Sequence, residues 1–527
     1  MAAPRGAAGR DDAVTRGRNT PPAAVGEADP GRAADGLSDD AQVGRLASEG
    51  ARWGVVAQVV QQALSVAATM VLARLLTPAD FGLVTASITV LGLVQLALAL
   101  GWGPAVVRRR EVDDIYLSSV FWVVTGIGTV LAAVIAAAAP FLADIVGVPG
   151  AAPYLMVLGL SSIPAAALVV PHSILQRRLQ LRAIQVASII SLIVYVVIQV
   201  GLAMLGAGAW SVVVGMVAQS CVYMTAMAIS ARWVPRPVFR RRPVGEDLRL
   251  AGGLLVNNGI TYGVRNLDYV VVGNLLGPAT LGAYYVAYVL PQILRLRATW
   301  AASSVLFPFL ARSQSDARRT QEVYDQTQLL LAWLGFPAMV GLAVLARPVV
   351  HVFFGSQWAA AVLPLRWLAL AALLEFVTFG PPMVATAQGL VRPMLATNLV
   401  RIALLVVGLL IAGAAYGTVG AVAAAVFLST LVWAVHQQLT LARRLGLVFA
   451  SLLRRLCLIG LLSILMGAGV GLLLAWVDHW PPVVQLAGCT VAGVILYLGL
   501  GYLLARDLTV PLARSALAIL RSGGRNP

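Results

Sequence analysis

Lysine is absent from this chain, and cysteine and charge are scarce. Among 527 residues there are 38 basic side chains, every one of them arginine, and charged residues make up only 11%. Soluble domains carry roughly a quarter charged residues, so this composition excludes an ordinary soluble protein. The three cysteines, Cys221, Cys457 and Cys489, all fall within apolar runs, and no disulfide framework is predicted.

The motifs of common enzyme and metal classes are also missing. There is no HExxH sequence and no Walker loop, and the four histidines are scattered without metal-ligand spacing. The net charge of +16 has no soluble face on which to gather, so nucleic acid is not predicted as a partner. We therefore expect no enzyme, no catalytic residues, no bound metal and no cofactor.

Apolar residues are abundant: 59% of the chain is hydrophobic, and the mean hydropathy is +0.85. Apolar runs of about 20 residues follow one another from near residue 53 to near residue 505, and each can cross a bilayer as a helix. The sequence predicts an all-α polytopic membrane protein with fourteen transmembrane helices. The predicted spans are 53–74, 79–101, 117–140, 152–172, 183–205, 209–231, 250–275, 280–306, 327–346, 362–387, 393–413, 418–440, 456–477 and 483–505.

Arginine in the connections predicts the orientation of these spans. Loops after even-numbered spans carry clusters such as 108–110 and 239–242, whereas loops after odd-numbered spans carry almost none. Because positively charged loops stay in the cytoplasm, both termini are predicted to be cytoplasmic. The first 48 residues mix charges with Ala and Gly and have no apolar core, which is typical of a disordered tail rather than a secretory signal.

A short joint occurs twice in the chain, as "LLTPADFG" at 75–82 and "LLGPATLG" at 275–282. In the first copy Thr77 can cap a helix, Pro78 suits its first position, and Asp80 falls in its first turn. Further matches follow in the same order, pairing prolines 140 and 348 and glycines 147 and 355. Six helices separate the copies, so both halves have the same orientation, as in parallel-repeat transporters.

This repeat divides the chain into two pseudo-symmetric six-helix lobes followed by two extra helices. The pseudo-symmetry axis is expected to run along the membrane normal. The predicted parts are a disordered cytoplasmic tail (1–48), a first lobe (49–246), a second lobe (247–442), the last two spans (443–506) and a cytoplasmic C-terminal tail (507–527).

Charged residues deep inside predicted spans mark candidate substrate sites, because burying charge in a membrane is costly. They gather in the second lobe, where four arginines outnumber two carboxylates. Guanidinium groups match phosphate oxygens with a bidentate fork, so a net cationic cavity favours a phosphate-bearing substrate. The candidate binding residues are Arg265, Asp268, Arg295, Arg297 and Arg401, and Glu375 and Asp268 are candidates for ion coupling.

Two interpretations stay open for the charges on the seventh and eighth spans. Arg265 and Asp268 are three residues apart, so they can form a structural ion pair or contact the ligand. Arg295 and Arg297 follow Pro291, which is predicted to break the eighth span and open a polar pocket. Alternatively, these two arginines reach toward the cytoplasmic interface.

Arg401 lies near the middle of the eleventh span, where reaching the interface is harder. Glu375 either neutralises this arginine or serves as a proton or cation site.

Several longer stretches of the chain form recognisable motifs: "LARLLTPADFGLVTAS", "VPHSILQRRLQLRA", "VRNLDYVVVGNLLGPATLGAYYVAYVLP", "VLFPFLARSQSD" and "FFGSQW". Together they resemble the polysaccharide transporter branch of the MOP flippase superfamily, which comprises Wzx-type and colanic-acid-exporter-like proteins. The resemblance implies alternating access between two bundles, moving polyprenyl-diphosphate-linked oligosaccharides across the bacterial inner membrane. It places the family's Arg-x-x-Asp on Arg265 and Asp268. The long N-terminal tail departs from the family pattern.

The resemblance implies a flippase for cell-surface polysaccharide biosynthesis, with lipid-linked oligosaccharide, membrane lipids and glycan assembly proteins as partners. Within transport, a lipid II flippase-like or multidrug-exporter-like relative is the alternative. Outside transport, the alternatives are a membrane scaffold and a glycan polymerase. Intramembrane charge facing a cavity favours transport, since a scaffold has no need of it.

Overall fold

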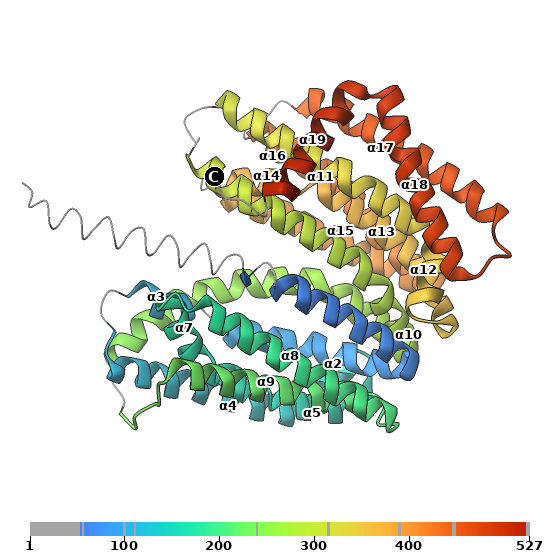
Figure 1. Cartoon of the computed structure of the whole chain (residues 1–527). Helices are drawn as coiled ribbons and strands as arrows, with labels where there is room; N and C mark the ends of the chain where they lie inside the picture. The colour runs from blue at the N-terminus through green and yellow to red at the C-terminus, as the bar shows by residue number, and fades with distance from the viewer. Residues whose placement is uncertain are drawn as a thin grey trace, which may run out of the picture. The chain divides into compact units, whose positions relative to one another are not determined.

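The computed structural model describes residues 53–54, 57–98, 102–109, 112–238, 241–312, 317–387, 391–444 and 449–522. Throughout this part of the chain the regular structure is helical and no strand occurs, which confirms the predicted all-α class (Figure 1). Residues 57–75 are helical. The following helices are α2 (Pro78–Leu98), α3 (Trp102–Arg108), α4 (Asp114–Ile145), η1 (Pro149–Ala151), α5 (Ala152–Gly159), α6 (Ser162–Ala167), α7 (Val169–Arg177), α8 (Leu181–Met204) and α9 (Trp210–Ala231).

The second half of the chain continues in the same manner. Its helices are α10 (Arg241–Arg312), α11 (Ala317–Val344), α12 (Ala346–Phe353), η2 (Ser356–Ala361), α13 (Val362–Val377), α14 (Gly380–Ala387), α15 (Val391–Tyr416), α16 (Val419–Arg444), α17 (Phe449–Trp476), α18 (Pro482–Leu504) and α19 (Arg506–Ser522). Helix α19 occupies most of the predicted C-terminal tail and packs on α11 and α18.

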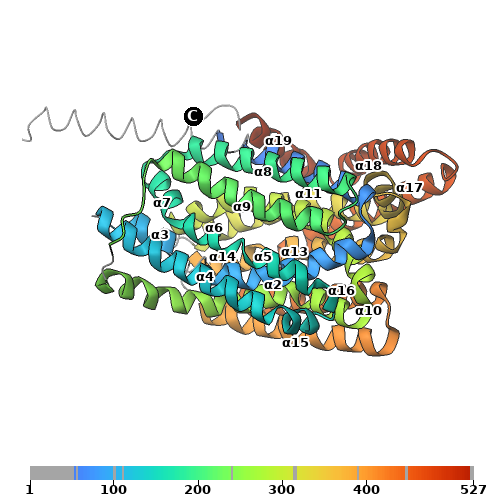
Figure 2. The same cartoon turned by 90° about the horizontal axis from the view of Figure 1, so that it is seen from below.

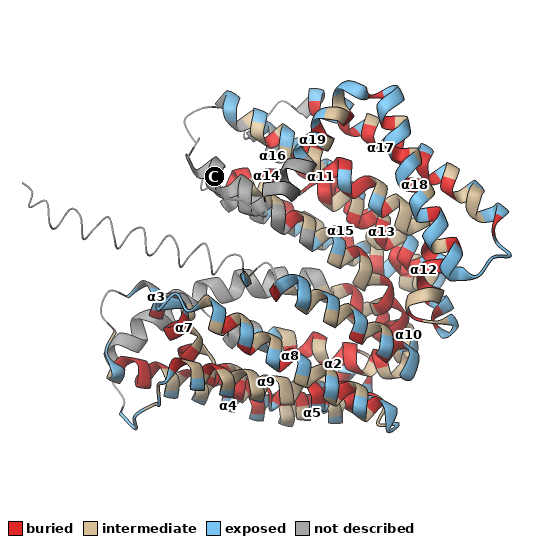
Figure 3. Ribbon diagram, viewed as in Figure 1, coloured by how far each residue is buried: buried red, intermediate tan, exposed pale blue. Residues whose placement is uncertain are grey.

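Eleven segments of the described chain are long and apolar enough to cross a membrane. Large apolar side chains remain exposed on several of these helices, including Leu472, Trp476 and Leu503, each about three-quarters exposed. Figure 3 shows such exposure along much of α17 and α18. Water would disfavour so much exposed apolar surface, whereas lipid tails would cover it. The chain is therefore a multi-pass membrane protein.

Two predicted spans are interrupted and one predicted interruption is wrong. The span 152–172 is divided among α5, α6 and α7, and the span 362–387 is divided between α13 and α14. Helix α10, by contrast, continues through Pro291, and its non-helical residue is Gly277, with a φ of 77°. A proline removes one backbone hydrogen bond, which a helix packed among other helices tolerates.

Neighbouring helices of the described chain pack against one another in pairs. Helix α8 contacts α9, and α15 contacts α16 (Figure 2). Helix α4 contacts α5 and α6, while α11 contacts both α13 and α17. The most extensive contact joins α2 to α10, two helices that lie far apart in the sequence.

The first copy of the repeated joint begins α2 with a reciprocal cap. The backbone N–H of Thr77 donates to Asp80 Oδ2 at 3.0 Å, and the N–H of Asp80 donates to Thr77 Oγ1 at 3.2 Å. Pro78 takes the first helical position, where no N–H is needed. In the second copy Gly277 stands where Thr77 stands in the first, and its positive φ turns the chain instead.

The two copies of the joint contact each other reciprocally. A methyl group on Gly82 would overlap the carbonyl of Pro278, and one on Gly282 would overlap the carbonyl of Pro78. Only hydrogen at both positions allows α2 and α10 to approach so closely. Such exchange of equivalent partners is what a two-fold relation between two segments produces.

The residues just before each joint make a second matched pair of contacts. Arg74 donates from Nη2 to the carbonyl of Val352 at 2.8 Å, and Asn274 donates from Nδ2 to the carbonyl of Ile145. In each case a side chain near one joint binds the backbone of a segment far away in the sequence. The indole and amide N–H groups of Trp358 and Gln357 also donate to the carbonyl of Ala73. These bonds fasten the helix just before α2 to α12 and η2, and they fasten α10 to α4.

Candidate functional site

The break between α13 and α14 positions the candidate site. Pro381 and Pro382 follow the end of α13, and prolines at these positions favour starting a new helix rather than continuing the old one. Ending a helix inside a membrane exposes carbonyl groups that water cannot reach, so the protein itself must supply donors.

Three buried glutamine side chains supply those donors. Gln328 on α11 and Gln438 on α16 both donate to the carbonyl of Val377, at 2.7 and 2.6 Å. Gln437 donates to the carbonyl of Thr378 at 2.8 Å. The glutamine residues are at most 5% exposed. Their amides therefore fix the end of α13 and with it the orientation of its last turn.

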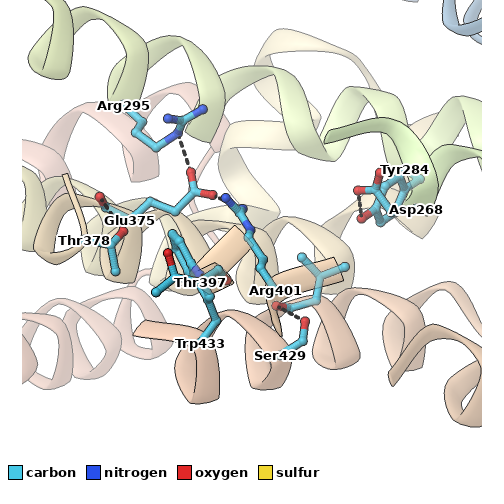
Figure 4. Close-up of polar contacts among 10 residues, drawn as sticks. Asp268, Tyr284, Arg295, Glu375, Thr378, Thr397, Arg401, Ser429 and Trp433 are labelled. Carbon is cyan, nitrogen blue, oxygen red and sulfur yellow. Dashed lines mark hydrogen bonds and ion pairs between the residues drawn. The ribbon is translucent and has the colours of Figure 1, made fainter. Parts of the chain in front are cut away.

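Glu375 in this last turn joins two arginines from other helices. Its Oε2 lies 2.7 Å from Nε of Arg295 on α10, and its Oε1 lies 2.5 Å from Nη2 of Arg401 on α15. The three side chains are only 16–26% exposed. Figure 4 shows the carboxylate held between the two guanidinium groups, one to each oxygen. Each contact is a charge-assisted hydrogen bond, the strong kind.

Trp433 on α16 supports the Arg401 side chain from a second direction. The guanidinium carbon lies 4.4 Å from the ring centroid, which is cation–π geometry. The indole N–H of this tryptophan donates to the carbonyl of Thr397 at 3.1 Å, a buried bond that fixes the ring. The stacked and paired guanidinium is thus held in one orientation.

A cavity of about 310 Å³ opens beside this network. Arg295, Glu375 and Arg401 line it together with Asp268, and polar side chains such as Gln292 add to its wall. Two guanidinium groups and two carboxyl groups therefore balance formally in the described lining. The excess of arginine predicted from the sequence depends on residues whose side chains lie outside the described part.

Asp268 occupies a different corner of the site, 4% exposed. Its Oδ2 accepts a hydrogen bond from the Tyr284 hydroxyl at 2.8 Å, and its Oδ1 accepts one from the Tyr269 N–H at 3.0 Å. Figure 4 shows this pair standing apart from the Glu375 network. The hydroxyl and the backbone N–H are neutral donors, unlike the guanidinium groups that hold Glu375.

Of the predicted site residues, Arg295, Glu375 and Arg401 contact one another in the structure, and Asp268 lines the same cavity. Arg295 points to Glu375 rather than outward to the interface (Figure 4). The side chains of Arg265 and Arg297 lie outside the described residues, and so does the proposed Arg265–Asp268 pair.

Sequence reasoning missed the polar residues that hold the site in place. These are the capping glutamines on α11 and α16, the supporting Trp433 and the Tyr284 hydroxyl. The glutamines carried a usable signal, because amides within apolar spans are costly and need partners there. Trp433 and Tyr284 carried none, since aromatic side chains are ordinary in membrane helices.

Solved structures with the same fold are membrane transporters. A structure titled "Lipid II flippase MurJ, inward closed conformation" has a TM-score of 0.69 and 15% identity, covering 86% of this chain and 99% of its own. An inward-facing multidrug resistance MATE family transporter of the MOP superfamily has a TM-score of 0.61 and 15% identity. The match covers 75% of this chain and 98% of that structure. The fold is thus that of the MOP transporters.

Sequence comparison narrows this class to one family. Residues 71–363 match the family described as "Polysaccharide biosynthesis protein". The succinoglycan biosynthesis transport protein ExoT of Rhizobium meliloti is 31% identical over 342 residues, 64% of this chain and 69% of its own. The lipopolysaccharide biosynthesis protein WzxC of Escherichia coli is 24% identical over 378 residues, which cover 70% of this chain and 76% of WzxC. The chain belongs to this polysaccharide biosynthesis family, as its sequence motifs predicted.

Proposed function

We propose that this protein is a flippase that moves polyprenyl-diphosphate-linked oligosaccharide across the bacterial cytoplasmic membrane by alternating access. Its membership of the polysaccharide biosynthesis family and its MOP fold support this function. The transport role named for the ExoT relative supports it further. The reaction is translocation, so the proposal requires no catalytic residue and no cofactor.

The observation that carries the proposal is the pair of guanidinium groups on Arg295 and Arg401 beside a membrane-embedded cavity. A diphosphate entering the membrane must exchange its hydration shell for donors of comparable strength. Arginine stays charged when desolvated and binds phosphate oxygens through a planar fork. We assign diphosphate binding to these two residues, with Arg265 and Arg297 as further proposed phosphate ligands and Asp268 as a further proposed substrate-binding residue.

The proposed architecture has fourteen spans in two six-helix lobes, with two helices added. The count extends the eleven candidate spans by the helix at 57–75, by the shorter apolar helix Pro78–Leu93, and by dividing the candidate Asn266–Leu296 at Gly277. The reciprocal contacts of the repeated joint support a two-fold relation between the lobes.

The lobes, tails and orientation follow the same scheme. The proposed parts are 1–48, 49–246, 247–442, 443–506 and 507–527, with both termini in the cytoplasm. Asp268 and Glu375 are the proposed sites of ion coupling. Glycan assembly proteins are the proposed protein partners, because the substrate must be made on one face and used on the other.

The test is export by arginine variants in a strain that lacks the chromosomal copy. Arg295→Gln and Arg401→Gln each remove one charged partner for phosphate, which is worth about 1.5–3 kcal/mol. We expect lipid-linked oligosaccharide to accumulate on the inner face and surface glycan to fall by roughly 10- to 150-fold. Arg366→Gln is the control, since Arg366 is exposed on α13.

Folded yield in detergent must be equal among these variants for the comparison to hold. Normal export by both Arg295→Gln and Arg401→Gln would contradict the assignment of the site. Loss of export by Arg366→Gln as well would indicate a general effect of arginine rather than recognition in the cavity.

A further inference from the structure

The Glu375 carboxylate engages both of the arginines on which the proposed diphosphate recognition depends. Each of its two oxygens is taken by a different guanidinium, at 2.7 Å from Arg295 and 2.5 Å from Arg401. A phosphate group presents at least two anionic oxygens to donors in a comparable way. The two arginines are therefore already engaged by an anion of the protein's own, at the edge of the cavity.

We infer that Glu375 is a resident counter-ion that competes with the substrate's phosphate for Arg295 and Arg401 and is displaced when substrate binds. This assignment rests on the proposed diphosphate recognition and adds a residue that sets its strength. Glu375 on this view lowers affinity and favours release, rather than holding substrate.

Charge balance in the cavity favours displacement over simple addition. The described lining contains two guanidinium and two carboxyl groups, so these four groups by themselves offer a diphosphate no net positive charge. Two charges of like sign a few ångströms apart repel one another strongly in a partly buried site. Moving Glu375 away from the guanidinium groups removes that repulsion and exposes both cations to the ligand.

A carrier that returns empty also needs an internal anion. Two unpaired guanidinium groups in a largely buried site would be costly, since breaking a buried ion pair leaves an uncompensated charge. Glu375 can satisfy both when substrate leaves. It lies in the last turn of α13, two residues before the helix ends at Val377. Its side chain can leave the guanidinium groups by rotation about its own bonds, while the glutamine amides hold the backbone of that turn in place.

Binding of inorganic pyrophosphate to the purified full-length chain in nanodiscs tests this inference. Competition predicts that Glu375→Gln binds pyrophosphate at least tenfold more tightly than the parent protein. A residue that merely holds the arginines in place would give the opposite sign, with weaker binding. Glu322→Gln is the matched control: it removes one negative charge from an exposed pair with Arg318 on α11 and should leave the affinity unchanged.

A second variant and a double variant separate competition from other effects. Glu375→Asp keeps the charge, but it is too short to span both guanidinium groups, so it should bind pyrophosphate more tightly by a smaller factor. This variant also serves if Glu375→Gln does not fold. In the Arg401→Gln background, the gain from Glu375→Gln should shrink, because one of the contested cations is gone. A gain in affinity of equal size in that background would indicate general repulsion between the Glu375 charge and pyrophosphate, rather than competition for the arginines. It would overturn the inference.

The outcomes distinguish the inference from the proposed function. If the parent protein binds pyrophosphate through Arg295 and Arg401, but Glu375→Gln binds it no more tightly, the inference is wrong and the proposed recognition stands. The proposed diphosphate recognition is wrong as well if neither the parent nor any Glu375 variant binds pyrophosphate. It is also wrong if Arg295→Gln and Arg401→Gln both leave the affinity for pyrophosphate unchanged.

Discussion

Alanine in place of Gly82 or Gly282 is expected to separate the two copies of the repeated joint. The new methyl group would overlap the carbonyl of the opposing proline, Pro278 or Pro78. A backbone carbonyl within a helix cannot swing aside as the tip of a flexible side chain can, so α2 and α10 must move apart. Overpacking of this kind costs about 1–3 kcal/mol, which shifts an equilibrium between two arrangements by roughly 5- to 150-fold.

Alkylation of a cysteine at position 73 measures this separation. Ala73 is 0% exposed, and its carbonyl accepts hydrogen bonds from Gln357 and Trp358 on η2. In a background without the native cysteines, Ala73→Cys should be labelled slowly. Adding alanine at either joint glycine should raise the labelling rate at least fivefold, because η2, which packs on α10, moves away from Ala73 together with α10.

Gly126→Ala is the matched control for these variants. Gly126 lies within α4, and a methyl group there would meet nothing within 4 Å. Alanine in place of a helical glycine stabilises the helix by about 0.5–1 kcal/mol, so labelling at position 73 should stay slow. Equal labelling rates in the joint variants and the control would refute the reasoning, since the joint would then not hold the two helices together.

Three other predictions concern the site and the topology. Trp433→Leu removes the ring face under a guanidinium 4.4 Å away, worth about 0.5–2 kcal/mol, so export at equal folded yield should fall roughly 2- to 30-fold; unchanged export would contradict this. Tyr284→Phe removes the hydroxyl that donates to Asp268 at 2.8 Å, and an unpaired buried acceptor costs about 1–3 kcal/mol. The thermal midpoint in detergent should therefore drop, and an unchanged midpoint would mean that this bond contributes nothing. A single cysteine at position 478 should be labelled from outside by an impermeant reagent and one at position 240 should not; the reverse pattern would invert the topology.

The positions of uninterrupted helices could be predicted because bilayer thickness sets their length. The span predicted at 183–205 corresponds to α8, Leu181–Met204, and the span predicted at 209–231 corresponds to α9, Trp210–Ala231. In both cases an apolar run is bounded by a turn with glycine or polar residues. Hydropathy alone locates such a helix within a few residues.

Helix breaks could not be predicted, because they depend on partners elsewhere in the chain. Pro291 carries the usual signal for a break, yet α10 continues through it. The span 362–387 breaks after Val377. There, buried glutamine amides from two other helices donate hydrogen bonds to the carbonyl that the helix end leaves free. A local sequence pattern contains the proline but not the donors that decide whether the backbone can open there.

For the site, the sequence predicted which charged residues lie within the spans, but it did not predict how strongly these residues would attract an anionic ligand. Counting side chains gave an excess of arginine, whereas the described cavity lining balances two guanidinium groups against Glu375 and Asp268. These two carboxyl groups are not equivalent. Glu375 bridges Arg295 and Arg401 directly, so its displacement would expose both cations, while Asp268 is held by the Tyr284 hydroxyl and a backbone N–H. The charge available to an anionic ligand is therefore set by which ion pairs can separate, a property of geometry that no count of residues contains.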